Sequence, residues 1–403
     1  MMRRAPLKRV ARINPDVLAE DTDPDRLLSY IDIGSVGRGV LAEQPEEMRF
    51  SAAPSRARRL VQSGDVIIST VRTYLRAVLS IEESLNGYVA STGFAVVRPG
   101  PQIDPGYLRW SLESDDFIES VVSGSVGVSY PATTSTTIAN LPISLPPMQK
   151  QVRVAEFLNG VTGRIDTLIT EYENQIELLR AERQSTITAS MVGEWPTRTL
   201  RSLAHVDLGR QRSPQHATGP HMVRYLRAAN VKDGVLDLSD VKEMNFTPTE
   251  QAHFSLVSGD VLVSEGSGSL RSVGANAVWS GELDGTVCFQ NTLLRLRPRS
   301  ESVDADFLAW LCRSYFDGGA FAAVAEGVNI HHLSANRVRA LPAPFPPAAE
   351  QHRISALLNA ETSRIDLHAI EIESQIGSLR ELRQALITTA VTEGVEACEA
   401  VAV

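Results

Sequence analysis

Hydrophobic positions between residues 151 and 190 recur with the spacing of a long amphipathic helix. Most of them are separated alternately by four and three residues, which is the heptad spacing of a coiled coil. This apolar stripe consists of Val154, Leu158, Val161, Ile165, Leu168 and Tyr172, and is extended by Ile176, Leu179 and Ile187. The pattern predicts a single helix of ~41 residues, which is ~60 Å long at ~1.5 Å per residue.

The chain contains this helix twice. Residues 151–190 and 351–390 align without a gap, and 18 of the 40 positions are identical. In the second copy, Glu361 and His368 interrupt an otherwise similar stripe. Both copies follow a proline-rich stretch, and each ends near a glycine, Gly193 or Gly394, where a helix C-terminus favours positive φ. The second stripe consists of Ile354, Leu358, Ile365, Ile372, Ile376, Leu379 and Ile387.

An amphipathic helix of this length cannot bury its apolar stripe alone, so we expect the two copies to pack together. The first helix leads into the segment between the copies, and the second helix returns from it. Chain order therefore predicts an antiparallel coiled coil. With one globular domain at each end, the expected architecture is a dumbbell with pseudo-two-fold symmetry.

The two remaining large segments are diverged copies of one domain. SGDVIIST (63–70) corresponds to SGDVLVSE (258–265), and FAVVRP (94–99) corresponds to LLRLRP (293–298). These short apolar runs predict strands, whereas residues 107–123 and 307–325 predict helices. We therefore expect two paralogous α+β domains. The predicted divisions are 1–146 (first domain), 147–193 (central repeat helix), 194–346 (second domain), 347–394 (C-terminal repeat helix) and 395–403 (tail).

Composition narrows the class of protein without naming a function. The formal net charge is −9, which argues against a uniformly basic nucleic-acid binder but allows locally basic surfaces. No apolar run approaches the ~20 residues that a membrane-spanning helix needs. Three widely separated cysteines match neither a disulfide framework nor a zinc site. We expect a cytoplasmic protein.

The sequence carries no recognised catalytic motif. It lacks a phosphate-binding loop with its lysine, a glycine-rich dinucleotide-binding turn, and the usual signatures of adenine methyltransferases and nucleases. His331 and His332 are adjacent, so they cannot share one helix face as metal ligands do. We expect no catalytic centre and no metal site in this chain.

Recognition residues are expected in two polar loops of each domain. Arginine and tyrosine can contact phosphates and base edges, and the small serine and threonine residues allow a close approach to the DNA backbone. An exposed hairpin loop with no ligand explains the same residues, and for Arg210 and Arg212 a solvated loop is the preferred interpretation. The candidate DNA-binding residues are Arg72, Tyr74, Arg76, Tyr130, Arg271 and Asn329.

Polar identities on the repeated helices are candidates for partner binding. Surface ion pairs within and between helices would explain them, at well under ~1 kcal/mol each. A symmetric docking surface for two copies of a partner explains them equally well, and both interpretations stay open. The candidates are Arg164, Asp166, Gln175 and Arg180 with their equivalents Arg364, Asp366, Gln375 and Arg380.

Taken together, these segments resemble the specificity subunits of type I restriction-modification systems. Residues 145–188 and 345–391 are similar to the family's repeat helices, and GDVIISTVRTYLRAV, YLRAANVKDG and GDVLVSEG are similar to passages of its target-recognition domains. The resemblance covers nearly the whole chain, except for the tail EACEAVAV.

The resemblance implies a non-catalytic DNA reader. Each domain would read one half of a bipartite, asymmetric site on double-stranded DNA, and the helices would set the gap. Two modification subunits would methylate adenine with S-adenosylmethionine, and two restriction subunits using ATP and Mg²⁺ could join them. The chain itself would need no cofactor.

Alternatives from other classes remain open. The chain could be a duplicated coiled-coil scaffold that does not recognise DNA, or an enzyme with unrecognised motifs. It could also be the specificity chain of an orphan adenine methylation system without restriction. The recognised base sequence and the spacer length cannot be derived from the sequence.

Overall fold

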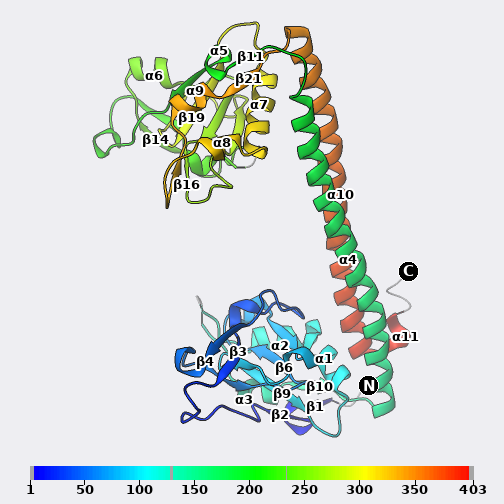
Figure 1. The fold of residues 1–403 in the computed structure, drawn as a ribbon. Coiled ribbons are helices and arrows are strands. Elements are labelled where there is room, and N and C mark those ends of the chain that lie inside the picture. The colour runs from blue at the N-terminus through cyan, green and yellow to red at the C-terminus, as the bar shows by residue number, and fades with distance from the viewer. Residues whose placement is uncertain (1–3, 128–129, 233, 399–403) are drawn as a thin grey trace. The chain divides into compact units, whose positions relative to one another are not determined.

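The computed structural model describes residues 4–127, 130–232 and 234–398. By internal contacts the chain forms two compact units. The first comprises Met1–Glu173 with Glu373–Val403, and the second comprises Asn174–Ile372. Each unit thus holds one α+β domain together with about half of each long helix (Figure 1).

Two four-stranded sheets form the frame of the first domain. One is antiparallel with strand order β2-β9-β6-β7, and the other has the order β4-β3-β8-β5 with a parallel β3–β8 pair. The three α-helices of this domain, α1, α2 and α3, lie between β9 and β10 in the chain. Their bounds are β1 Arg4–Pro6, β2 Ala11–Ile13, β3 Leu27–Ile31, β4 Glu46–Arg49, β5 Ala57–Leu60, β6 Val66–Ser69, β7 Val78–Ser80, β8 Val89–Ser91, β9 Phe94–Pro99, α1 Pro105–Glu113, α2 Asp115–Ser123, α3 Ser135–Asn140 and β10 Pro142–Ser144.

The second domain repeats this topology. Its antiparallel sheet has the order β12-β19-β15-β17, and a three-stranded sheet β14-β13-β18 again contains one parallel pair. The predicted α+β class and the duplication are therefore confirmed. The bounds are β11 Thr197–Thr199, α5 Leu200–Leu203, β12 Ala204–Leu208, β13 Met222–Leu226, β14 Lys242–Asn245, α6 Pro248–Phe254, β15 Asp260–Ser264, β16 Gly266–Ser267, β17 Asn276–Trp279, β18 Val287–Phe289, β19 Leu293–Pro298, α7 Ala305–Asp317, α8 Ala320–Val324, β20 His331–His332, α9 Ala335–Ala340 and β21 Pro342–Pro344.

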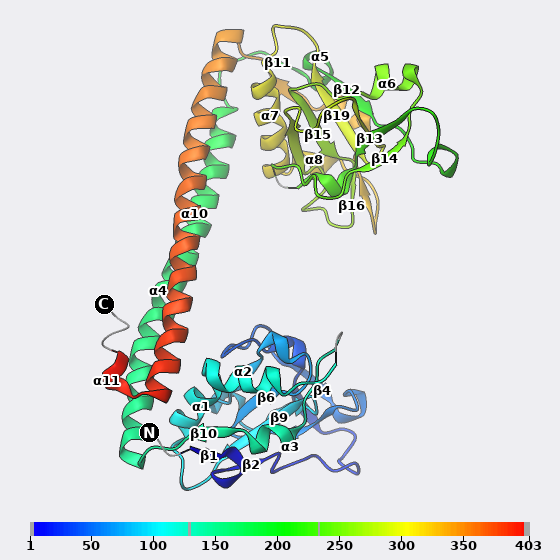
Figure 2. The same cartoon turned by 180° about the vertical axis from the view of Figure 1, so that it is seen from behind.

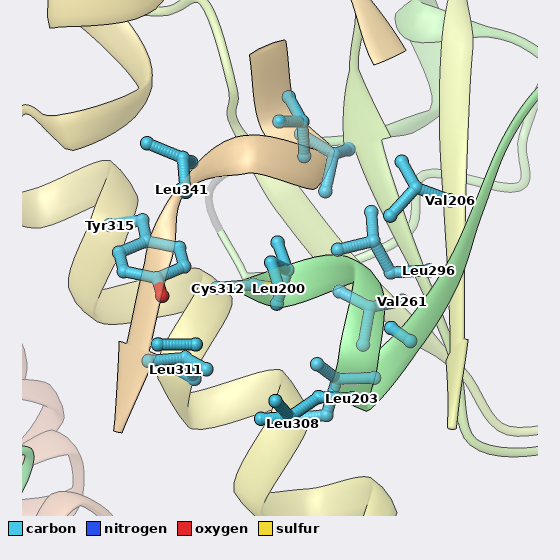
Figure 3. Packing of buried hydrophobic residues seen from close by; sticks show 14 of the residues in the cluster. Leu200, Leu203, Val206, Val261, Leu296, Leu308, Leu311, Cys312, Tyr315 and Leu341 are labelled. Atoms are coloured by element: carbon cyan, nitrogen blue, oxygen red, sulfur yellow. The ribbon is translucent and has the colours of Figure 1, made fainter. Parts of the chain in front are cut away.

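The core of the second domain continues into the long helices. Its main cluster packs α5 and α7 against the sheet, with Leu200, Leu308 and Val261 among the buried side chains (Figure 3). Ile187 from one long helix and Leu358 from the other belong to the same cluster. The domain and its half of the helix pair therefore share one hydrophobic core.

The two long helices are α4 (Met148–Ser190) and α10 (Ala348–Thr392), and a short helix α11 (Val395–Cys398) follows. Ion pairs connect α4 to α10 within each unit. In the first unit, Arg383 Nε lies 2.9 Å from Asp166 Oδ1, and in the second, Arg183 Nε lies 3.0 Å from Asp366 Oδ1. Residue numbers rise along α4 as they fall along α10, so the predicted antiparallel pairing is confirmed.

The predicted apolar stripe of α4 is wrong at two positions. Leu168 is 43% exposed, whereas the neighbouring Ile169 is buried, and the stripe uses buried Thr162 where the heptad predicted Val161. The Thr162 hydroxyl donates to the Leu158 carbonyl oxygen at 2.6 Å, which satisfies it within its own helix. Because this bond removes the cost of burying a hydroxyl, threonine can occupy the seam in place of Val161.

The two glycines after the helices play different roles. Gly394 adopts φ +105°, as expected for a left-handed helix cap. Gly193 is absent from the positive-φ residues of the described chain, so that expectation was wrong. A Cβ atom at Gly193 would lie 2.5 Å from the Trp195 ring, so the glycine is required by space rather than by backbone conformation.

The described part of the chain contains no helix long and apolar enough to cross a membrane.

The corrected stripe gives a direct test by matched substitutions. Replacing buried Ile169 with alanine should lower the free energy of unfolding of the first unit by about 2 kcal/mol, because apolar contacts are lost. Replacing exposed Leu168 with alanine should cost less than about 0.5 kcal/mol. Urea unfolding followed by helical circular dichroism measures both. A larger loss for Leu168→Ala than for Ile169→Ala would contradict the assignment.

Candidate nucleic-acid interface and partner surface

A strained loop joins β6 to β7 in the first domain. Arg72 and Arg76 flank a single 3-10 turn, Thr73–Leu75, and both have positive φ, 49° and 55°. Non-glycine residues rarely adopt this conformation, and it costs of order 1–3 kcal/mol when it is held. The turn leaves Tyr74 and Leu75 about half exposed.

Arg76 holds this loop against helix α2. Its guanidinium lies 3.4 Å from Asp115 Oδ1 and also contacts Glu119. Two carboxylates therefore already occupy the donors that a phosphate would need. This arrangement favours a structural role for Arg76 over the predicted DNA contact.

Arg72 lies beside Tyr130, which is far away in the sequence. The guanidinium carbon is 5.3 Å from the centre of the Tyr130 ring, and Tyr130 is 69% exposed. Below them, Thr73 Oγ1 and Ser125 Oγ lie 2.7 Å apart and join the two loops. The stacked pair presents a charged donor fork and a planar ring together, which suits contacts to phosphates and bases.

The second domain brings its equivalent loops together by a different route. Strand β16, which follows β15, pairs with β20, so that Ser267 lies opposite His331. The candidates Arg271 and Asn329 are both exposed in the connections that flank this pairing. His332 Nδ1 lies 3.2 Å from Glu265. The loop position is thus shared by the two domains, but the side chains differ.

Sequence reasoning missed a cationic groove along β13 and β14. Arg212, Arg227 and Lys242 line a cavity of about 460 Å³. Arg227 and Lys242 each lie 2.5 Å from a carboxylate oxygen of Asp240. The basic residues Arg227 and Lys242 were the signal available in the sequence. The pairing of β13 with β14, which brings them together, could not be derived from the sequence.

Arg210 is not on a solvated loop, which corrects that interpretation. It is buried, lies 2.8 Å from Glu250 Oε1, and stacks over the Phe246 ring. The cause is Gly209, where a Cβ atom would be 2.3 Å from the backbone of Gln290. This close approach draws the chain, and Arg210 with it, inward.

The repeated SGDV segments are structural. Asp65 is buried and accepts two hydrogen bonds of 2.8 Å from Arg98. Asp260 is buried too and accepts two of 2.6 Å from Arg297. A bidentate ion pair with arginine satisfies the hydrogen-bonding capacity of each buried carboxylate. The two SGDV segments therefore stabilise the fold of their domains, and they lie beside the candidate loops rather than within them.

The candidate partner-binding residues divide between two roles. Asp166, Asp366, Arg364 and Arg380 all form ion pairs between the long helices. Arg180 pairs with Glu177 of its own helix, and Arg164 donates to the Gly160 carbonyl oxygen. All six side chains are exposed, as is Gln375, whereas Gln175 is half-buried. Interhelical pairing therefore accounts for four of the candidates, and docking stays a prediction.

A buried carboxylate lies where the first domain meets the helices. Glu113, at the end of α1, is 1% exposed, and its Oε1 lies 3.2 Å from Arg109 Nε. Its Oε2 has no hydrogen-bond partner among the described side chains and backbone. Burial raises the pKa of Glu113 above its usual value, although Arg109 and Arg383 oppose the shift. Within the described residues, no cluster of histidine, cysteine or acidic side chains could hold a metal ion.

Comparison with known proteins agrees with the fold. A family model of the type I restriction modification DNA specificity domain matches residues 54–178. The specificity subunit of the type I restriction enzyme StySPI from Salmonella potsdam is 20% identical over 73% of this chain and 66% of its own length. That of EcoKI from Escherichia coli K12 is 19% identical over the same shares. The chain thus matches slightly less than two thirds of these relatives.

Solved structures show the same fold. A chain from a study of complex assembly and conformational transition in a type I R-M system aligns with a TM-score of 0.76 and 22% identity, covering 97% of this chain and 98% of that one. The HsdS subunit from Thermoanaerobacter tengcongensis aligns with a TM-score of 0.51 and 22% identity, covering 97% of both chains. Residues 54–178 thus match the DNA specificity domain of type I restriction-modification systems, and the chain is similar to specificity subunits of type I restriction enzymes over most of its length, in agreement with the resemblance.

The buried Glu113 predicts a pH-dependent stability. Below the ordinary carboxyl pKa, Glu113 is protonated in both the folded and the unfolded chain. As pH rises through its raised folded-state pKa, the folded state loses stability, because a charge must be held in the interior. Glu113→Gln should therefore raise the melting temperature at pH 8 and leave it nearly unchanged at pH 4.

Thermal unfolding by circular dichroism at the two pH values measures this difference. Glu156→Gln, on the exposed face of α4, is the matched control and should show no such pH dependence. An equal effect of Glu113→Gln at both pH values would contradict the account.

Proposed function

We propose that this chain is the DNA-reading subunit of a type I restriction-modification complex. Each α+β domain reads one half of a bipartite, asymmetric site, and the antiparallel helices set the gap between the halves. The observation that carries the proposal is the duplication itself. Two domains of one topology are tied to one helix pair, and their equivalent loops present different side chains.

The loop chemistry supports two unlike half-sites. The first domain offers Arg72 stacked on Tyr130, whereas the second offers Arg271 and Asn329 beside a histidine pair. Arginine fits the acceptor edge of guanine, and asparagine fits adenine. Identical loops would instead suit a palindromic site.

The catalytic steps belong to partner subunits in this proposal. Two modification subunits dock on the helices and domains and methylate adenine with S-adenosylmethionine. Restriction subunits that use ATP and Mg²⁺ can join them. The exposed Arg164 and Gln375, which interhelical ion pairs do not account for, support a docking surface on the helices.

DNA binding by the isolated chain should be weak. The net charge is −9, and Arg76 and the groove residue Arg227 are already paired with carboxylates. Affinity would therefore come largely from the assembled complex and fall steeply with salt.

Mapping of methylated adenines tests the function. The chain is co-expressed with the modification subunit of its own system, and modified positions are read across the host genome. The proposal expects one bipartite, non-palindromic site with a fixed gap. A scaffold without DNA recognition would leave no sequence preference, and methylation by the chain alone would indicate an enzyme.

Loss of one loop arginine should relax one half-site only. Arg72→Ala should reduce discrimination in the half read by the first domain by about 1–3 kcal/mol per affected base pair, and Arg271→Ala should do so in the other half. Methylation rates on duplexes with single base changes give both values. Relaxation of the same half-site by both variants would contradict the assignment of one half to each domain.

Shortening both helices by one heptad should change the gap alone. Seven residues correspond to about 10 Å, or about three base pairs. The methylation map of this variant should show the same half-sites at a new separation. Altered half-sites at the original gap would contradict the spacer role.

A further inference from the structure

One tryptophan in each domain contacts the helix pair in the same way. Trp110 of α1 donates its indole N–H to Asn159 Oδ1 of α4 at 3.0 Å. Trp310 of α7 donates to Asn359 Oδ1 of α10 at 2.9 Å. The two bonds are equivalent in the two copies of the repeat, since each joins residues 49 positions apart.

The other helix of the pair completes each contact with an arginine. The guanidinium carbon of Arg383 is 5.7 Å from the Trp110 ring centre, and that of Arg183 is 5.9 Å from Trp310. Both distances lie within cation–π range. Each arginine also forms the ion pair to Asp166 or Asp366 described above. Each tryptophan is therefore bound to both long helices at once.

A buried glutamine adds a second attachment point in each unit. Gln151 Oε1 accepts from the Asp104 backbone N–H at 2.9 Å, and Gln351 Oε1 accepts from that of Asp304 at the same distance. Their amide groups donate to backbone carbonyl oxygens in both units. With the tryptophan and glutamine contacts at two separate places, each domain has a fixed orientation as well as a fixed position on its half of the helix pair.

These contacts persist although the domains have diverged. The loops and strand sequences differ between the copies, yet each tryptophan, asparagine, arginine, aspartate and glutamine of this set recurs 200 residues later. Apolar packing alone could hold a domain to a helix without such directional bonds. The internal contacts divide the chain in a way that agrees with this attachment, because each compact unit contains one domain together with about half of each long helix.

We propose that the sets Trp110–Asn159–Arg383 and Trp310–Asn359–Arg183 are positioning residues for spacer selectivity. They hold each reading domain at a fixed angle on the helix pair. The permitted gap between the half-sites is then set by the helices and not by movement of a domain relative to the helices that it contacts. This inference rests on the proposed function. The residues touch no DNA base; they act through the domains that they orient.

The test measures discrimination between gaps. Full-length chain assembled with its modification subunit methylates duplexes that carry the native half-sites at the native gap or at a gap one base pair longer or shorter. Asn159→Ala and Asn359→Ala remove the bond at exposed helix positions, and Trp110→Phe removes the donor while keeping an aromatic ring. Each variant should lower the preference for the native gap at least tenfold, with half-site preference unchanged.

Trp279→Phe is the matched control. Trp279 is buried in the second domain's sheet, within a cluster that contains no residue of α4 or α10, so its loss should lower the melting temperature without altering gap preference. Full gap discrimination in both asparagine variants, or equal loss of it in Trp279→Phe, would overturn the inference. A wild-type complex that methylates no bipartite site would instead refute the proposed function.

Discussion

The structure depends on the burial of one apolar stripe on each of two long helices. Helices of 43 and 45 residues with exposed stripes would not be stable separately, and each provides the other's partner surface. In each ion pair between them at least one side chain is about half exposed, so each pair contributes at most about 1 kcal/mol. Buried Ile165, Ile169 and Ile372, with Thr162 and its equivalent Thr362, therefore hold the pair together. Because one domain is inserted between the helices, chain order imposes the antiparallel direction.

The duplication separates what keeps a domain folded from what distinguishes it. The buried pairs Asp65–Arg98 and Asp260–Arg297 recur because each domain needs a satisfied carboxylate beside its central strands. The loops above those strands carry no such constraint and differ in residue type. Variation on an invariant frame suits a protein whose two domains recognise different sequences.

Much of the architecture could be predicted from the sequence. The helix repeat and the α+β class follow from local periodicity, and the direction of the helix pairing follows from chain order. The burial of Ile169 in place of Leu168 could not be foreseen, because the two neighbouring side chains are both apolar and the sequence pattern does not distinguish them. Candidate site residues were less predictable: the pairing of Arg72 with Tyr130, the capture of Arg76 by α2 and the burial of Arg210 all depend on contacts between distant segments.

Cross-linking of introduced cysteines tests the antiparallel pairing most directly. A short bis-maleimide should link Asp166→Cys to Arg383→Cys within one chain, since the native side chains lie 2.9 Å apart, and the three native cysteines are buried. The pair Asp166→Cys and Asp366→Cys, which only parallel helices would align, should remain unlinked. Efficient linkage of the second pair and none of the first would contradict the account.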